Sequence, residues 1–388
     1  MNNSFRSGTI QSINVKAKLQ TQRDNAVLSP DKSSNHESLS DCVYSDSELN
    51  YDDMITYKNL RTAYFQTIKG KQHRYRVQKF KQNFVSELKQ LYKELKTRAY
   101  RPGAPKEFKI WCTAGQKNRI IRAPTLRDLI VQRLLYNYVY DAFDKGFIFD
   151  SYGCRKQKGA HKSADRTQHF IKQSDNDSYY LQIDIHHYYY SIQKTVLKKS
   201  LERKIKDCRI VDLLLRFMPA VGVDVGSILA QLFGLIYLDR FDHYVKRQLK
   251  IKRYIRYVDD MVFIGLKKDE CHRLLTRIQN YLQNDLKLTL SKWKIQKLSN
   301  GINFCGYRTN PQYRLIRKRS IKTFNRALQH RDYKALESIL AHAEHSASYR
   351  FLIQKLKGLD GFPEHLKRRI VKWHTTHLHP PKGHTATV

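Results

Sequence analysis

The stretch Tyr254–Gly265 (YIRYVDDMVFIG) decides the fold, because strand-like apolar runs flank the adjacent acids Asp259 and Asp260. β-Branched and aromatic residues on both sides predict an antiparallel hairpin whose turn carries the acids. Two like charges are costly to bury side by side, and a bound cation would offset their repulsion. The pair is therefore a candidate metal site, although an Asp-Asp dipeptide read alone also fits an exposed turn.

A third acid has a similar context. Asp184 lies near the end of Tyr179–Ile185 (YYLQIDI), an apolar run that predicts a buried strand. Carboxylate oxygens suit Mg²⁺, and a pair of such ions can activate a primer 3′-hydroxyl and stabilise the leaving pyrophosphate. Asp184, Asp259 and Asp260 together therefore predict nucleotidyl transfer with two Mg²⁺ ions, for which Mn²⁺ can substitute.

The composition predicts a globular protein with a polyanionic partner. The chain has 388 residues, 41% of them hydrophobic, and its 72 Lys and Arg against 35 Asp and Glu give a formal charge of +37. Such an excess attracts nucleic acid, although a basic surface without a specific ligand is the alternative. No apolar run approaches the roughly 20 residues needed to span a bilayer, so no membrane partner is expected.

Cysteine usage and the N-terminus predict a cytoplasmic protein. The six cysteines stand far apart without a C-x-x-C pair, which is typical of reduced thiols. The opening residues MNNSFRSGTIQS lack the apolar segment of a signal peptide. We therefore expect the chain to remain in a reducing compartment.

Periodicity along the chain predicts an α+β fold in which two helices cover one face of a small antiparallel sheet. The expected helices are 57–99, 126–143, 197–217, 228–249 and 270–283. Beside the strands already named, strands are expected at 108–112, 119–122, 286–290 and 302–307. Residues 1–52 are polar with few apolar anchors, so we expect a flexible extension there.

From about Thr56 to Arg350 the chain resembles reverse transcriptases, because the acidic motifs and their flanking segments follow that family's order. The resemblance implies a right-hand polymerase. Its fingers would span residues 53–175, its palm residues 176–311 and its helical thumb residues 312–378, followed by a tail at 379–388.

The resemblance also implies roles at the acidic motifs. Asp184 and Ile185 resemble the first acidic motif, in which the aspartate and the next carbonyl bind metal. Tyr189 resembles the steric gate that excludes a ribose 2′-hydroxyl. Residues 257–260 resemble the Y-x-D-D box, which makes Asp259 and Asp260 the remaining metal-binding and catalytic acids.

Two further segments resemble the family's nucleotide-binding parts. Gly222–Gln231 (GVDVGSILAQ) resembles the glycine loop and helix beneath the nucleotide, with Gly226 and Gln231 as candidate contacts. Read alone, it equally fits a helix start capped by Ser227. The strands expected at 108–112 and 119–122, with the turn 114–118 between them, form a basic hairpin. This hairpin resembles the fingers element over the triphosphate, where Lys117, Arg119 and Arg122 would bind phosphate, although an isolated basic hairpin is more often merely solvated.

Two later segments resemble motifs that handle pyrophosphate and primer. Lys294, after the Leu-Thr-Leu run 288–290, resembles the lysine that can protonate pyrophosphate. The primer grip would be formed by Phe304, Gly306 and Tyr307, with cysteine at 305 where leucine is usual.

Two segments are similar to diversity-generating retroelement enzymes, namely Asp150–Lys162 (DSYGCRKQKGAHK) and Ala341–Arg350 (AHAEHSASYR). Gln231 also fits that branch. Asp224 and Ala230 depart from it, because proline and serine are usual at those positions. Related bacterial enzymes serve antiphage defence, so sequence diversification and defence both stay open as biological roles.

The implied partners are a dedicated non-coding RNA template, deoxynucleotides, the DNA product, and an accessory protein or second subunit. The alternative is a catalytically silent RNA-binding scaffold of polymerase descent. Retention of all three acids counts against that alternative, since a scaffold has no need of them.

Overall fold

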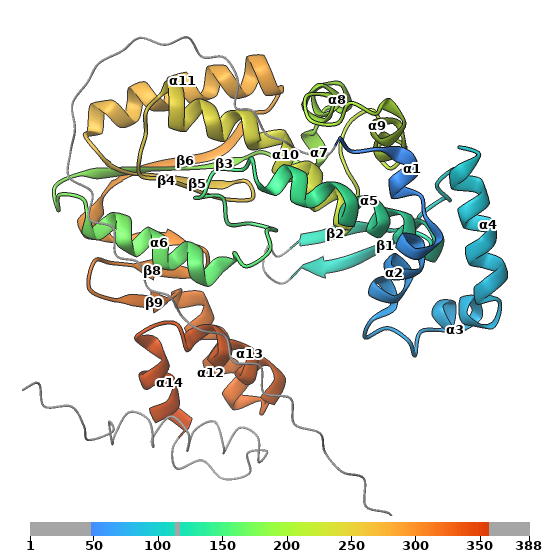
Figure 1. Cartoon of the computed structure of the whole chain (residues 1–388). Helices are drawn as coiled ribbons and strands as arrows, with labels where there is room; N and C mark the ends of the chain where they lie inside the picture. Colours follow the sequence, from blue (N-terminus) through green and yellow to red (C-terminus); the bar gives the residue numbers. More distant parts are fainter. Residues whose placement is uncertain (1–47, 113–116, 357–388) are drawn as a thin grey trace, which may run out of the picture. The chain divides into compact units, whose positions relative to one another are not determined.

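The computed structural model describes residues 48–112 and 117–356, and these residues form helices and antiparallel strands (Figure 1). This confirms the predicted α+β class. The predicted tail, the last part of the predicted thumb and nearly all of the predicted N-terminal extension lie outside the described residues.

The central sheet has the strand order β4-β5-β3-β6, with all neighbours antiparallel. Its strands are β3 (Tyr179–Ile185), β4 (Tyr254–Tyr257), β5 (Asp260–Leu266) and β6 (Leu290–Lys297). The predicted hairpin is therefore confirmed as β4–β5. Side chains alternate across a strand, so β3 buries Leu181 and Ile183 on one face and presents Gln182 and Asp184 on the other.

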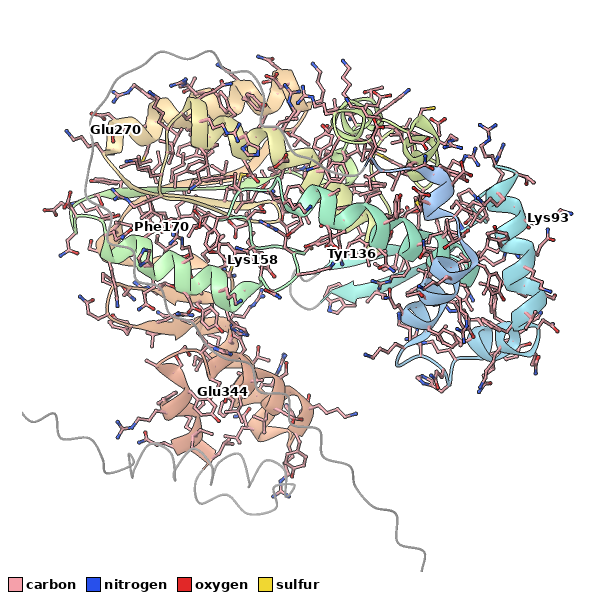
Figure 2. The ribbon with its side chains drawn as sticks, viewed as in Figure 1. Lys93, Tyr136, Lys158, Phe170, Glu270 and Glu344 are labelled. Atoms are coloured by element: carbon pink, nitrogen blue, oxygen red, sulfur yellow. The ribbon has the colours of Figure 1, made fainter. Side chains whose placement is uncertain are left out.

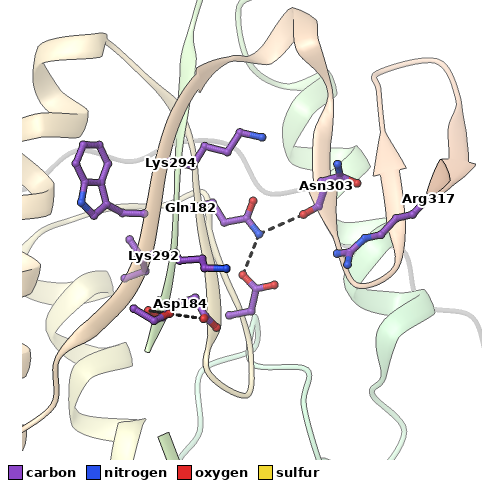
Figure 3. A pocket seen from close by; sticks show the side chains of 10 residues that line it. Gln182, Asp184, Lys292, Lys294, Asn303 and Arg317 are labelled. Atoms are coloured by element: carbon purple, nitrogen blue, oxygen red, sulfur yellow. Dashed lines mark hydrogen bonds between the residues drawn. The ribbon is translucent and has the colours of Figure 1, made fainter. Parts of the chain in front are cut away.

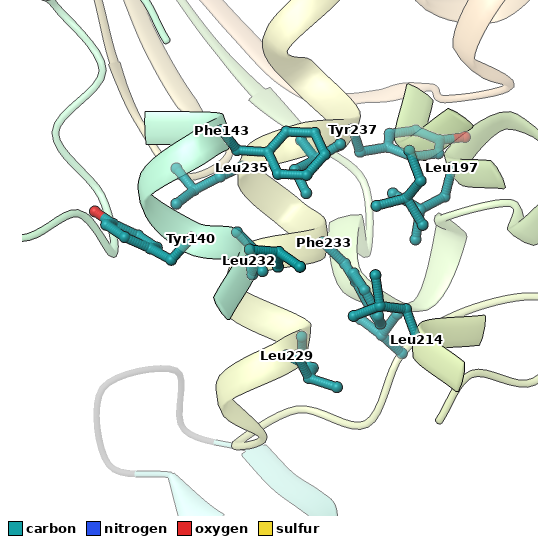
Figure 4. Packing of buried hydrophobic residues seen from close by; sticks show 14 of the residues in the cluster. Tyr140, Phe143, Leu197, Leu214, Leu229, Leu232, Phe233, Leu235 and Tyr237 are labelled. Atoms are coloured by element: carbon teal, nitrogen blue, oxygen red, sulfur yellow. The ribbon is translucent and has the colours of Figure 1, made fainter. Parts of the chain in front are cut away.

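Two long helices, α10 (Ile228–His243) and α11 (Lys268–Leu286), lie on the Ile183 face of the sheet, as predicted (Figure 1). The sequence of α10 is apolar almost all round, which is typical of a helix enclosed on several sides. Figure 4 shows Leu232, Phe233 and Tyr237 of α10 between α5 (Leu126–Asp144) and the pair α8 (Lys194–Glu202) and α9 (Cys208–Leu215). The main core therefore joins the sheet to the N-terminal helices.

The opposite face of the sheet carries the acids and is partly covered by α6 (Ala160–Lys172) and β7 (Ile302–Phe304). Phe170 of α6 packs here with Ile255, Val262 and Phe304, and Figure 2 shows it between α6 and the sheet. This second core leaves Gln182 and Asp184 only partly buried.

Several predicted bounds are wrong, for local reasons. The expected strand 286–290 is absent among the described residues, because α11 runs to Leu286 and ends on Lys287, whose φ is +54°. The expected strand 302–307 reverses at Cys305 and Gly306, both with positive φ, and forms β7 and β8 (Tyr307–Thr309). The helix expected at 197–217 is α8 and α9, with Asp207 capping the second.

The N-terminal part is helical, with one separate hairpin. The helix expected at 57–99 ends first at Ile68, just before a turn that contains Gly70 with φ +71°, and is interrupted again at Asn83. The pieces of the expected helix are α2 (Tyr57–Ile68), α3 (Tyr75–Gln82) and α4 (Phe84–Lys96), and the short helix α1 (Tyr51–Met54) precedes them. The expected basic hairpin is formed by β1 (Lys106–Cys112) and β2 (Lys117–Ala123), which pair only with each other in the described chain.

A further core forms near the C-terminal end of the described residues. Its elements are β9 (Arg314–Ile316), α12 (Lys318–Gln329), α13 (Tyr333–Ala343) and α14 (Ser348–Leu356). Tyr307 of β8 and Ala164 of α6 belong to the same core, so these helices pack directly on the neighbouring strands.

Candidate active site

The turn between β4 and β5 is strained. Tyr257 pairs with Asp260, which leaves a two-residue loop of Val258 and Asp259. Val258 has φ +59°, at a position where hairpins usually place glycine. Such a conformation in a β-branched residue costs on the order of 1–3 kcal/mol and persists only when neighbours enforce it.

Arg256 is one of the groups that hold this turn. Its Nη1 donates to the Val258 carbonyl at 3.1 Å, while Nε and Nη2 donate to the Asp242 carboxylate at 2.6–2.9 Å. Tyr254 donates to the same carboxylate at 2.7 Å, and both members of the ion pair are 0% exposed. Burial lowers the pKa of Arg256, but Asp242 more than offsets this and the net pKa is raised.

Gly153 supports the turn from the other side. A Cβ at this position would lie 2.4 Å from Val258 Cγ2 and 2.6 Å from its backbone nitrogen. Only glycine therefore allows the loop after α5 to approach the hairpin this closely.

Asp184 and Asp260 are register partners on adjacent strands. Ser291 donates to Asp184 Oδ2, and Gln182 Nε2 donates to Asp260 Oδ1 at 2.9 Å. Burial raises the pKa of Asp260 to about 7, with the charges of Asp184 and Asp259 adding to the effect. Asp260 thus feels the charges of both other acids at the point where the sheet face meets the turn.

Asp259 lies in the turn itself, and its charge reaches groups on two sides of it, because it also contributes to the raised pKa of Asp260. Its charge contributes to the raised pKa values of Tyr189 and Cys154, for which burial is the larger cause. The Cys154 thiol and the Tyr189 hydroxyl are hydrogen-bonded to each other. The Asp259 charge is therefore felt at the candidate steric gate, while Asp260 is hydrogen-bonded to Gln182.

The donor set at these acids fits a magnesium site. Within 48–112 and 117–356, no three His, Cys, Asp or Glu side chains are gathered closely enough to hold a metal ion in this arrangement. The oxygen chemistry nevertheless suits Mg²⁺, and a cation would relieve the repulsion that raises the pKa of Asp260. Asp184, Asp259 and the Ile185 carbonyl remain the predicted ligands, with Asp260 at the edge.

A pocket of about 850 Å³ opens beside Asp184 and Asp260. Lys292 and Lys294 of β6 line it, Lys292 opposite Asp184 and Lys294 opposite Gln182 in the strand register (Figure 3). Burial lowers the pKa of Lys294. The predicted lysine therefore lies two residues further from Asp184 than Lys292 does.

Sequence reasoning missed part of this pocket. Lys292, Gln182, Ser291, Asn303 and Arg317 all line it, and Gln182 Nε2 also donates to the Asn303 carbonyl at 3.2 Å (Figure 3). The period of a strand could have indicated Gln182, which precedes Asp184 by two residues and shares its face. Asn303 and Arg317 come from distant segments, so no local pattern indicates them.

The predicted nucleotide-binding residues are only partly brought together. Arg122 pairs with Glu107 at 2.6 Å and lies 3.8 Å from Asp224, which brings the basic hairpin to the glycine loop. Gly226 has φ +100° and is exposed, as is Gln231. Ser227 caps α10, so the helix-start interpretation of this segment is also correct. The side chains of Lys117 and Arg119 lie outside what the structure describes.

The predicted primer grip is a tight turn. Phe304 and Tyr307 are both 0% exposed, so their side chains face the protein interior. Gly306 forms the turn between them with φ +90°. Contact with a primer would therefore come from the turn itself rather than from the two aromatic rings.

These elements define a class. Residues 112–309, more than half of the chain, match the family described as reverse transcriptase (RNA-dependent DNA polymerase), and the chain belongs to that family. The fold is the right-hand polymerase fold, and the class of enzyme is an RNA-directed DNA polymerase, a nucleotidyltransferase.

Individual relatives are more distant. The chain is 26% identical to protein YkfC of Escherichia coli (strain K12) over 284 residues, which covers 60% of this chain and 72% of YkfC. It is 20% identical over 311 residues to a putative COX1/OXI3 intron 2 protein of Saccharomyces cerevisiae, covering 60% of this chain and 36% of that protein. The chain thus spans about a third of the yeast protein.

Solved telomerase structures are similar at a lower level. The telomerase of Candida albicans, in complex with a fragment of telomeric RNA, is 14% identical with a TM-score of 0.45, over 70% of this chain and 55% of that chain. Apo telomerase of Candida tropicalis is 14% identical with a TM-score of 0.39, over 55% of this chain and 46% of that chain. The chain spans about half the length of either.

Proposed function

We propose that this enzyme copies a dedicated non-coding RNA into DNA by two-metal nucleotidyl transfer. The observation that carries the proposal is that Asp184 of β3 is the register partner of Asp260, which lies next to Asp259 in the strained β4–β5 turn. When bound, two Mg²⁺ or Mn²⁺ ions would activate the primer hydroxyl and neutralise the leaving pyrophosphate. The chain's part is to hold the ligands, the primer end and the triphosphate in line.

Each part has a supporting contact. Tyr189 is proposed as the steric gate, because it packs against Gly234 of α10 and lies beside the Asp259 charge. Arg122, with Lys117 and Arg119 from the same hairpin, would bind the triphosphate above Gly226 and Gln231. Lys294 would donate a proton to pyrophosphate, with Lys292 as the nearer neighbour of Asp184.

The domain bounds belong to the same proposal: fingers 53–175, palm 176–311 and thumb 312–378. A hydrophobic core distinct from the main one, formed mostly by β9 and the C-terminal helices, supports a thumb that packs on the palm through Tyr307. The β4-β5-β3-β6 sheet with its acids supports a palm within the stated range.

The decisive experiment is deoxynucleotide incorporation by the full-length chain on poly(rA)·oligo(dT) with Mg²⁺ or Mn²⁺. Asp259→Ala should abolish incorporation, whereas Asp177→Ala, which removes an exposed acid at the far end of β3, should not. Incorporation by Asp259→Ala at the rate of the unaltered enzyme would contradict the proposed role of Asp259, whereas no incorporation by the unaltered chain would favour the silent RNA-binding scaffold.

The biological role is proposed as either antiphage defence or sequence diversification. Sequencing the DNA made in cells separates them, since adenine-directed errors over a variable-repeat copy favour diversification and a short or repetitive product favours defence. We place the enzyme in a prokaryotic cytoplasm, and the cysteines at 154, 208, 271 and 305 are free thiols, which suits a reducing compartment.

An accessory protein or second subunit is also proposed. Its support is a group of exposed apolar side chains on α2–α4, namely Phe65 (48%), Tyr75 (77%) and Val85 (55%). Among the described residues no helix is both long and apolar enough to cross a bilayer.

A further inference from the structure

The two segments that the sequence singled out around Asp150–Lys162 and Ala341–Arg350 meet in the folded chain. His161 of α6 and His342 of α13 approach the same atom, the hydroxyl oxygen of Tyr307, at 2.8 and 3.2 Å from their Nδ1 atoms. His345 stacks on His161 with ring centroids 3.8 Å apart. Three structural units thus converge: α6, the turn of the predicted primer grip, and the C-terminal helices.

The hydrogen-bond partners of the Tyr307 hydroxyl determine which groups act as donors. Tyr307 donates its single proton to the His342 carbonyl at 2.7 Å. A hydroxyl oxygen has only lone pairs left after that, so His161 must donate from Nδ1. The Tyr307 hydroxyl is therefore a shared hub that α6 and α13 bind from different sides.

The 304–307 turn packs closely against His342. A Cβ on Gly306 would lie 2.8 Å from His342 Nε2, so only glycine admits the imidazole here. The Tyr307 and His342 rings stack with centroids 4.3 Å apart, and Arg314 lies over the Tyr307 ring at 5.3 Å. Any rotation of α13 would therefore displace the 304–307 turn as well.

A continuous path joins this hub to the acids. Gln182 links Asp260 to the Asn303 carbonyl on β7, and β7 pairs with β8, which carries Tyr307. We propose that His161 and His342 are positioning residues that lock the C-terminal helices to the primer grip through Tyr307, and so set how long the enzyme retains its primer–template. This rests on the proposed primer-grip role of residues 304–307.

The test separates retention from chemistry. With poly(rA)·oligo(dT) and a heparin trap, His161→Leu should shorten products per binding event about fivefold, as the loss of one net hydrogen bond implies. Tyr307→Phe removes every hydrogen bond of the shared hydroxyl and should shorten them at least as much. In His161→Leu, which lies outside the proposed primer grip, the rate of single-nucleotide addition and its KM for dTTP should stay unchanged. Tyr313→Phe, a matched loss of a half-exposed hydroxyl in the next turn, should change neither.

His161→Asn supplies the rescue. Its amide can donate from nearly the position of Nδ1, so product length should recover towards that of the unaltered enzyme. Equal losses in retention and single addition, unchanged product length in Tyr307→Phe, or failure of the asparagine rescue would each overturn the proposal. Loss of activity through Asp259→Ala is independent of all three results, so the proposed polymerase function is tested separately.

Discussion

The two hairpins of this enzyme carry the two halves of the predicted chemistry in opposite physical settings. In the β4–β5 hairpin, Ile255, Met261 and Val262 are fully buried and a buried ion pair braces the turn. In the β1–β2 hairpin, Phe108, Ile110 and Trp111 are 43–57% exposed, and in the described chain the strands pair only with each other. An isolated strand pair is marginally stable.

This contrast suggests a division of labour. Carboxyl groups that repel one another must be held by a rigid frame, because any relaxation would separate them. Phosphate-binding cations on a hairpin of low local stability can instead move with their ligand. Damage to β4–β5 should therefore reduce folding stability and catalysis together, whereas damage to β1–β2 should change nucleotide binding alone.

The largest expected effect comes from breaking the buried Arg256–Asp242 ion pair, which braces the β4–β5 turn. Arg256→Met leaves the Asp242 charge buried without its partner and should cost about 3–5 kcal/mol of unfolding free energy in urea titrations. The double variant Arg256→Met/Asp242→Leu should regain most of that stability, since paired apolar replacements are often neutral. Its turnover should stay low, because the Val258 carbonyl still lacks its donor. Full turnover in the double variant would show that the brace does not position the turn.

The next effect concerns the contact behind the turn. Gly153→Ala should cost about 1–3 kcal/mol of stability, because its Cβ would overlap Val258 and the packed turn has little room to yield. Thermal unfolding and single-turnover incorporation measure both consequences. Gly146→Ala, whose Cβ would make ordinary contacts at 3.4 and 3.6 Å, is the matched control and should change neither.

A smaller effect is expected in the basic hairpin. Arg122→Ala should raise the KM for deoxynucleotides about tenfold, in line with the loss of one charge-assisted hydrogen bond to phosphate. Its unfolding free energy should hardly change, since the Arg122 side chain is 48% exposed and exposed ion pairs contribute little. A stability loss as large as that of Arg256→Met would remove the distinction between the two hairpins.

The smallest effect should be on the pH dependence of stability and concerns Asp224, which lies 3.8 Å from Arg122 of the β1–β2 hairpin. Burial raises the pKa of Asp224, Arg122 opposes this and Glu107 adds to it. The folded state therefore holds more protons than the unfolded state just above the usual Asp pKa, and stability falls slightly as pH rises through that window. Asp224→Asn should remove this part of the slope in melting temperatures between pH 4 and 7, and an unchanged slope would contradict the assignment.

The sequence predicted the parts of the fold that depend on local pattern. The hairpin, β3 and the two covering helices follow from alternation and from apolar runs, and all are confirmed. The strand expected at 286–290 failed because Leu286 and Leu288 read equally well as the end of a helix. No pattern marks the reversal at Cys305, a residue other than glycine with positive φ.

The candidate site divides in the same way. Asp184, Asp259 and Asp260 could be chosen in advance, since buried acids next to apolar strands are rare without a role. Asn303, Arg317 and the Tyr307 hub could not, because they depend on which distant segments the sheet brings together. Asp224 was noted in the sequence as a departure, and only its distance to Arg122 gave it a physical partner.

The loop that carries Gly153 also closes one edge of the central sheet. Arg256 donates its backbone N–H to the Asp150 carbonyl at 3.0 Å, and Tyr152 donates to the Arg256 carbonyl at 2.9 Å. Strand β4 is the end of the sheet, and an uncovered end strand recruits strands from other molecules. By occupying those backbone groups, the loop protects a highly apolar sheet from edge-to-edge aggregation.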